Sequence, residues 1–236
     1  MFKVRLLLTL CFMVNTMPGF SETAQTKVTI IGSLHKYHKG LSHYSFDDLK
    51  SLIKSKKPDV ICIEVKPENY KGIATSSAPY EYREVMMPFL LSTKAKIVPI
   101  DWVNADWNKL MEEQKMLSES PKTAELFNAI VNPLELLVKH ASDKPIAMLD
   151  YTFYNSDFID ELIEAQYGVL LNAFPENKIS QITEKRNENI GDLLIKAVRR
   201  NKGERILVLI GMEHKFVLKK RLLKLPEVKY LNIADF

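Results

Sequence analysis

The sequence has little of what several classes of protein require. Two cysteines among 236 residues, Cys11 and Cys62, cannot build a disulfide framework. Eight glycines and eleven prolines are too few for a collagen-like or low-complexity chain. The net charge of +4 is too small to indicate a nucleic-acid partner. What is present, 46% hydrophobic and 26% charged residues, is typical of a globular protein that can bury a core.

The N-terminal residues 1–21 have the pattern of a secretory signal peptide. Lys3 and Arg5 form a basic start, and Leu6–Val14 form an apolar run of nine residues. Such a run is too short to cross about 30 Å of hydrocarbon, and a small-residue cleavage site ending at Ser21 follows it. An uncleaved anchor is the alternative. We therefore expect an exported chain, periplasmic or secreted, with no stable membrane insertion after signal removal, because no later segment reaches 18 continuous apolar residues.

Strand and helix patterns alternate along residues 22–236, which we expect to form a single domain. Apolar and β-branched runs predict strands over residues 27–31, 59–65, 96–102, 204–210 and 228–233, and helical spacing predicts helices over 45–56, 80–93, 180–200 and 214–225. A mostly helical section, at about residues 104–178, is inserted among them. This order is typical of an α/β fold with a largely parallel or mixed central sheet and flanking helices.

Proline and charge refine this expectation. Pro99 removes a backbone donor from the third strand and favours an edge position or a bulge for that strand. Pro88 predicts a kink or a break in the helix over residues 80–93. The basic run 215–224 is interleaved with apolar residues, which predicts a helix with a solvated charged face.

Ionisable residues stand at or just past the carboxyl ends of four predicted strands. His35 follows the first strand, Glu64 lies at the end of the second, Asp101 ends the third, and Glu213 and His214 follow the fourth. In open α/β sheets these ends line the crevice where ligands bind. Imidazoles and carboxylates that meet there can bind a divalent metal such as zinc, manganese or iron. They can equally work as acid and base without a metal.

Glu64 carries the strongest signal because apolar, β-branched residues surround it. A carboxylate in a buried strand has to be paired, protonated or bound to a cation. The alternative to a metal is an internal salt bridge with Arg186. His35 and His214 can likewise be ordinary hydrogen-bonded residues. His38 lies in a polar loop, where we expect it to be solvated.

Two Gly-x-x-His elements, at residues 32–35 and 211–214, resemble the TraB/GumN and Tiki-type superfamily, which includes erythromycin esterase-like and ChaN-like proteins. Glu64 looks like that group's strand-two glutamate, and the pair Arg186-Asn187 is similar to its arginine-asparagine helix. The resemblance implies an α/β core with a shared crevice and, from Tiki-like members, hydrolysis of peptides that depends on a divalent metal. The site residues implied by it are His35, Glu64, Arg186, Asn187 and His214.

The function that we expect is that of an exported metal-dependent hydrolase acting on a peptide or ester bond. Its candidate ligands for manganese, cobalt or zinc are His35, Glu64 and His214, which leave a coordination position for water. Water at such a position can act as a nucleophile near neutral pH. Glu213 or Asp101 is the candidate general base. The partner is then a small-molecule or peptide substrate.

Three further residues complete the expected site. Arg186 either holds a substrate carboxylate or a developing oxyanion, or it keeps the strand-two carboxylate in place. Asn187 and His38 are candidates for binding substrate or for orienting the ligands. The competing function is that of a non-enzymatic exported protein that binds haem or another small ligand. By analogy with ChaN-like proteins, its haem ligand would be His35, Tyr37 or His38.

Overall fold

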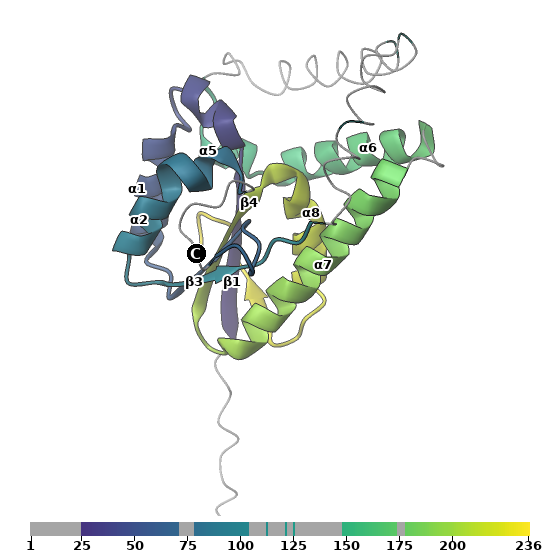
Figure 1. The fold of residues 1–236 in the computed structure, drawn as a ribbon. Coiled ribbons are helices and arrows are strands. Elements are labelled where there is room, and N and C mark those ends of the chain that lie inside the picture. Colours follow the sequence, from purple (N-terminus) through teal and green to yellow (C-terminus); the bar gives the residue numbers. More distant parts are fainter. Residues whose placement is uncertain are drawn as a thin grey trace, which may run out of the picture.

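The computed structural model describes residues 25–70, 78–103, 148–173 and 178–236, together with positions 112, 121 and 125. A sheet of five strands, all parallel, runs through the centre in the order β3-β2-β4-β1-β5 (Figure 1). The strands are β1 Thr26–Ser33, β2 Val60–Ile63, β3 Lys96–Pro99, β4 Arg205–Gly211 and β5 Val228–Tyr230. The predicted α/β fold is therefore confirmed.

Helices cover both faces of the sheet (Figure 1). They are the 3-10 helix η1 His35–Gly40, α1 Phe46–Lys56, the π-helix η2 Tyr82–Met86, α2 Met87–Ser92, α5 Tyr151–Tyr154, α6 Asp157–Ala173, α7 Lys178–Arg200 and α8 Met212–Leu222. One hydrophobic core joins the sheet to α1, η2 and α2, and a second joins it to α7 and α8.

Successive side chains of β2 point to opposite faces of the sheet and so pack into the two cores in turn. Ile61 and Ile63 pack on the α1 side, whereas Val60 and Cys62 pack on the α7 side, and all four side chains are fully buried. Burial of such side chains stabilises the fold by about 1.5–3 kcal/mol each. Cys62 is a free thiol, and burial raises its pKa to about 12. The burial of both faces of β2 fits the apolar run that predicted a strand over residues 59–65.

Helix α1 begins where the sequence predicts, at a capping box. The Ser45 hydroxyl accepts from the Asp48 backbone N–H at 3.2 Å, and the Asp48 carboxylate accepts from the Ser45 backbone N–H at 2.9 Å. A cap of this kind contributes about 1 kcal/mol. Leu49 and Ile53, four residues apart, place the buried side of the helix against the sheet.

The edge position predicted from Pro99 is confirmed, whereas the helix that contains Pro88 is not broken. Residues 80–92 stay helical throughout, but the hydrogen bonding changes from the π-type in η2 to the α-type in α2 between Met86 and Met87, directly before Pro88. Pro99 closes β3, which is an edge strand.

The described stretch of the inserted section, residues 148–173, is mostly helical and contains α5 and α6. Most of residues 104–147 lie outside the described part of the chain. Residues 1–21, for which a signal peptide is predicted, lie outside it as well. None of the helices in the described part of the chain combines the length and apolarity that a membrane span requires.

The prediction of a solvated face for the basic run 215–224 is wrong at its first residue. Lys215 is buried, and its ammonium group donates to both carboxylate oxygens of Asp160 in α6, at 2.6 and 2.7 Å, and to the Asn155 carbonyl at 3.0 Å. A lysine can be buried when a carboxylate compensates its charge in this way. The contact ties α8 to α6.

Candidate functional site

The carboxyl ends of β1, β2 and β4 meet at one edge of the sheet, and Gly211 lies at the point of closest approach. A Cβ atom at this position would lie 2.6 Å from His35 Nε2 and 3.2 Å from Glu64 Oε2. A side chain at this position would overlap the histidine ring unless that ring moved, so the close approach favours glycine. The structure thus brings together residues from both Gly-x-x-His elements and the carboxylate of β2.

Glu64 lies just past the end of β2 and is 2% exposed. Its Oε1 accepts from Arg186 Nη2 at 2.6 Å, and its Oε2 accepts from the Gly211 backbone N–H at 2.7 Å. Burial raises the pKa of this carboxyl to about 7, although the charge of Arg186 acts in the opposite direction. The salt bridge that the sequence left as the alternative to a metal is present.

Asp101 shares Arg186 with Glu64. Its Oδ1 accepts from Arg186 Nε at 3.1 Å and from Nη2 at 2.9 Å, and it also accepts from the Trp102 backbone N–H at 2.8 Å. All three charged side chains are buried. Arg186 therefore joins the ends of β2 and β3, and Asp101 is engaged in holding it.

His214, in the first turn of α8, has one ring nitrogen held and the other without a partner. Its Nδ1 lies 2.5 Å from the Asn187 side-chain oxygen, which can only accept, so Nδ1 carries the proton. Its Nε2 then bears a lone pair, is buried, and has no hydrogen-bond partner among the described residues. Burial lowers the pKa of His214 well below its ordinary value, and Arg186 and His35 act in the same direction. This neutral nitrogen lies 3.8 Å from Glu64 Oε1 and 3.6 Å from Glu213 Oε1.

His35 is held in an unusual conformation by a buried carboxylate. Its φ of 51° lies in the left-handed region, where few side chains other than glycine are found. Its Nδ1 lies 2.5 Å from Glu81 Oε1, which also accepts from the Ser33 hydroxyl at 3.1 Å. Burial acts to lower the pKa of His35, but the hydrogen bond to Glu81 and the surrounding carboxylates raise it to about 9. Glu81 is fully buried.

The expectation that His38 is solvated is wrong. Its ring is fully buried, with Nε2 accepting from the Leu34 backbone N–H at 2.9 Å and Nδ1 donating to the Tyr44 carbonyl at 2.6 Å. Burial lowers the pKa of His38, which favours this neutral form. Because the main chain engages both ring nitrogens, His38 braces the loop after β1 and has none left for a metal, a substrate or haem iron. Tyr37 is 68% exposed.

Sequence reasoning missed two residues that support the site. Glu81 orients His35, and Asn155 accepts from the Gly32 backbone N–H at 2.7 Å through its side-chain oxygen. The sequence contained a signal for Glu81, because an acidic residue beside the apolar positions of the helix predicted over residues 80–93 is a candidate for a buried, paired carboxylate. Asn155 gave none, because 123 residues separate it from Gly32 and no pattern links them.

Negative charge exceeds positive charge among the described buried groups of the site. Glu64, Glu81 and Asp101 are carboxylates, whereas Arg186 is the matching cation, so two negative charges remain when the histidines are neutral. In the described part of the chain, no three His, Cys, Asp or Glu side chains already form a group that could hold a metal ion. With both histidines neutral the site therefore has the charge for a divalent cation, but its donor atoms do not yet surround one common point.

Comparisons with models of known families, with curated proteins and with solved structures find no match to this chain.

Proposed function

We propose that this protein is an exported hydrolase that binds a divalent metal at the carboxyl ends of β1, β2 and β4. The observation that carries the proposal is the buried Nε2 of His214, a neutral nitrogen with an unused lone pair that lies 3.8 Å from a carboxylate oxygen of Glu64. A lone pair that faces a carboxylate is unfavourable unless a proton or a cation lies between them. The His214 ring is fixed through Nδ1, as is usual for metal-ligating histidines.

The donor set fits a divalent cation in kind. His35 and His214 are each held at Nδ1 by an oxygen acceptor, which leaves their Nε2 atoms to act as ligands with Glu64. A histidine ligand has to be deprotonated, and with His35 neutral the buried carboxylates exceed Arg186 by two negative charges, which a divalent ion would neutralise. Because the ligand atoms are not yet grouped, binding has to draw them closer together than they lie in this structure.

The chain's own groups divide the remaining roles. A divalent metal would supply a Lewis acid that polarises water or a substrate carbonyl. Glu213 is the better general base, because its side chain is half exposed and lies 3.6 Å from His214, whereas Asp101 is committed to Arg186. Arg186 orients Glu64 and stays positively charged, so it can stabilise negative charge that develops nearby.

The substrate class is a peptide or an ester, and the site of action is outside the cytoplasm. Both parts rest on the sequence: the resemblance of the Gly-x-x-His elements gives the reaction, and the N-terminal pattern gives the export. The competing haem-binding function would have to use His35 or the exposed Tyr37, since the main chain engages both ring nitrogens of His38.

Thermal unfolding of chelator-treated protein, with and without manganese, cobalt or zinc, tests the metal. We expect at least one ion to raise the melting temperature, because an ion that binds the folded state stabilises it by mass action. His214→Ala should abolish this rise. His43→Ala, which removes an exposed histidine, is the matched control and should leave it unchanged.

Hydrolysis is tested separately, with panels of chromogenic peptides and esters assayed with and without the ion that raises the melting temperature. Activity that depends on that ion, and that His214→Ala removes, is the expected result. A melting temperature indifferent to all three ions, or an equal rise in His214→Ala, would contradict the proposal. A Soret band in the purified protein would favour haem binding instead.

A further inference from the structure

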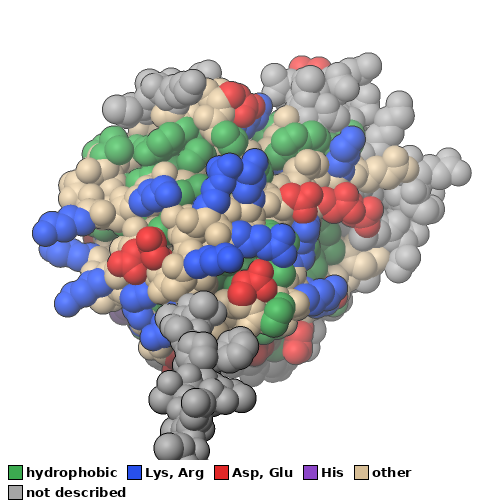
Figure 2. Space-filling view, turned by 90° about the horizontal axis from the view of Figure 1, so that it is seen from below, with side chains coloured by type: hydrophobic (Ala, Val, Ile, Leu, Met, Phe, Trp, Pro, Cys, Tyr) green, Lys and Arg blue, Asp and Glu red, His purple; other side chains and the backbone are tan. Residues whose placement is uncertain are grey.

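The face of the molecule at the amino ends of the strands carries Lys and Arg side chains over much of its area, with Asp and Glu between them (Figure 2). A groove of about 570 Å³ lies on this side, at the opposite end of β2 from Glu64. That volume is in the range of small-molecule sites. The groove is lined by Ile53, Lys54, Lys57, Pro58, Ile61, Phe89, Ser92, Thr93, Lys94 and Ala95.

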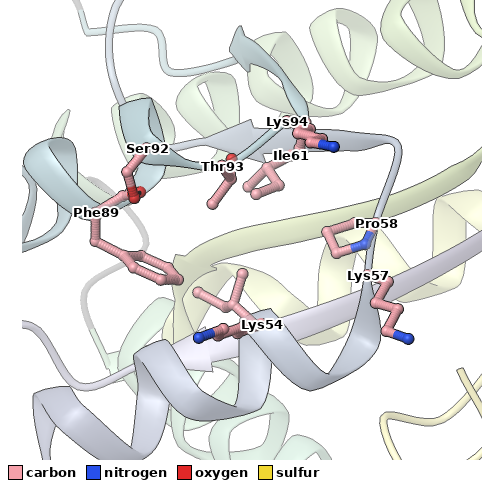
Figure 3. Close-up of a pocket in the computed structure, with 10 residues that line it drawn as sticks. Lys54, Lys57, Pro58, Ile61, Phe89, Ser92, Thr93 and Lys94 are labelled. Atoms are coloured by element: carbon pink, nitrogen blue, oxygen red, sulfur yellow. Dashed lines mark hydrogen bonds between the residues drawn. The ribbon is translucent and has the colours of Figure 1, made fainter.

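The floor of the groove is apolar. Ile53 of α1 and Ile61 of β2 line it, and Phe89 reaches from α2 toward α1 (Figure 3). Pro58 and Ala95, which precede β2 and β3, add further apolar surface. A ligand with a hydrocarbon or aromatic body would gain about 25 cal/mol for each Å² of apolar surface that it buries here.

The rim of the groove is basic. Lys54 and Lys57 come from the end of α1 and Lys94 from the turn before β3, so cations stand on two sides of the opening (Figure 3). All three are exposed, they form no ion pair with any acidic side chain in the described residues, and no acidic residue lines the groove.

The hydroxyl groups of the groove cannot serve as donors to a ligand. Ser92 donates to the Phe89 carbonyl and Thr93 donates to the Leu90 carbonyl, each at 2.7 Å. A polar ligand group in the groove therefore finds its donors in the three lysines. Ammonium groups above an apolar floor complement a ligand that carries one anionic end on an apolar body.

We propose that this groove binds a small amphipathic carboxylate, such as a medium-chain fatty acid. Its apolar body lies against Ile61 and Phe89, and its carboxylate lies at the rim, within reach of the exposed side chain of Lys54, Lys57 or Lys94. Charge complementarity and the apolar floor together select this ligand class. An inorganic phosphate would use the lysines but not the floor, and a neutral alcohol would use the floor but not the lysines.

Isothermal titration calorimetry of the full chain with sodium decanoate, below its micelle concentration and in the presence of a chelator, tests the proposal. We expect saturable binding with a dissociation constant below about 1 mM, and binding of inorganic phosphate and of 1-decanol that is weaker by about tenfold or more. Equal affinity for phosphate, or for decanol, would overturn the proposal, as would the absence of saturable binding.

Variants locate the site. The double variant Lys54→Gln, Lys94→Gln changes two exposed side chains and should weaken decanoate binding about tenfold or more. Lys224→Gln changes an exposed lysine that does not line the groove and should leave the affinity unchanged. Equal binding by the double variant and the control would show adsorption elsewhere and overturn the proposal. Because the chelator removes divalent ions, the result is independent of the metal-dependent hydrolase.

Discussion

Removing one carboxylate from Arg186 at a time separates a metal ligand from a salt-bridge partner. Glu64→Gln turns one charge-assisted hydrogen bond into a neutral one, and its amide NH₂ then faces either Arg186 or the Gly211 N–H, both of which are donors. Asp101→Asn does the same to the other partner of Arg186. The two variants are therefore matched in chemistry, in burial and in the cation that they affect.

The cost in stability should be similar for both. Removing one partner from a buried ion pair costs about 3–5 kcal/mol. Because Arg186 keeps its second carboxylate in either variant, we expect the lower end, about 3 kcal/mol. In a domain of this size each kcal/mol shifts the melting temperature by about 2–4 °C, so the chelator-treated variants should melt about 6–12 °C below the wild type.

The response to metal should differ. At an ion concentration 100 times its dissociation constant, the wild type gains about 2.7 kcal/mol. Loss of the ligand Glu64 should weaken binding by about 100-fold or more, which leaves about 0.4 kcal/mol at the same ion concentration. Asp101→Asn should keep nearly the full gain. Scanning calorimetry with and without the ion measures both quantities. If both variants keep the metal response, or both lose it, Glu64 has no ligand role distinct from that of Asp101.

Gly211→Ala should lower the free energy of unfolding by about 1–3 kcal/mol in urea, because its Cβ would overlap the His35 ring, whereas Gly40→Ala meets no atom within 4 Å and should be neutral; equal effects would contradict the close approach. The pKa of His35 is raised from 6.5 to about 9, so its contribution is complete below pH 6.5 and is lost as the pH rises through 9. We expect metal-free protein to lose about 3 kcal/mol over that interval in urea titrations, and the loss should vanish in His35→Gln. N-terminal sequencing of exported protein should find a start at residues 22–25, after Ser21, and an intact first residue would refute cleavage.

The sheet was predictable because its inner strands β1, β2 and β4 are almost wholly buried and their sequences are apolar runs. The carboxyl-end rule then placed His35, Glu64 and His214 at one edge without knowledge of the strand order. Strand ends were less predictable. The pattern placed Glu64 inside a strand, but β2 ends at Ile63, just where the carboxylate turns to meet Arg186.

The surroundings of the site were not predictable from local pattern. His38 lies in a sequence that is polar throughout, yet main-chain groups satisfy both its ring nitrogens and bury it. Lys215 was expected in water because its neighbours are basic, and only the distant Asp160 explains its burial. Both errors have one cause, since a polar residue is buried when tertiary contacts supply partners that the nearby sequence does not contain.

The position of β4 between β2 and β1 determines when the sheet can form during synthesis. The first three strands are complete by residue 99, but β1 pairs with β4 and β5, and β2 pairs with β3 and β4. Until residues 205–211 leave the ribosome, β1 and the β2–β3 pair have no edge in common. The growing chain therefore carries apolar strands without their central partner for more than 100 residues, a state prone to aggregation. His35, which follows β1, and Glu64, which follows β2, come together only when β4 has joined these two strands.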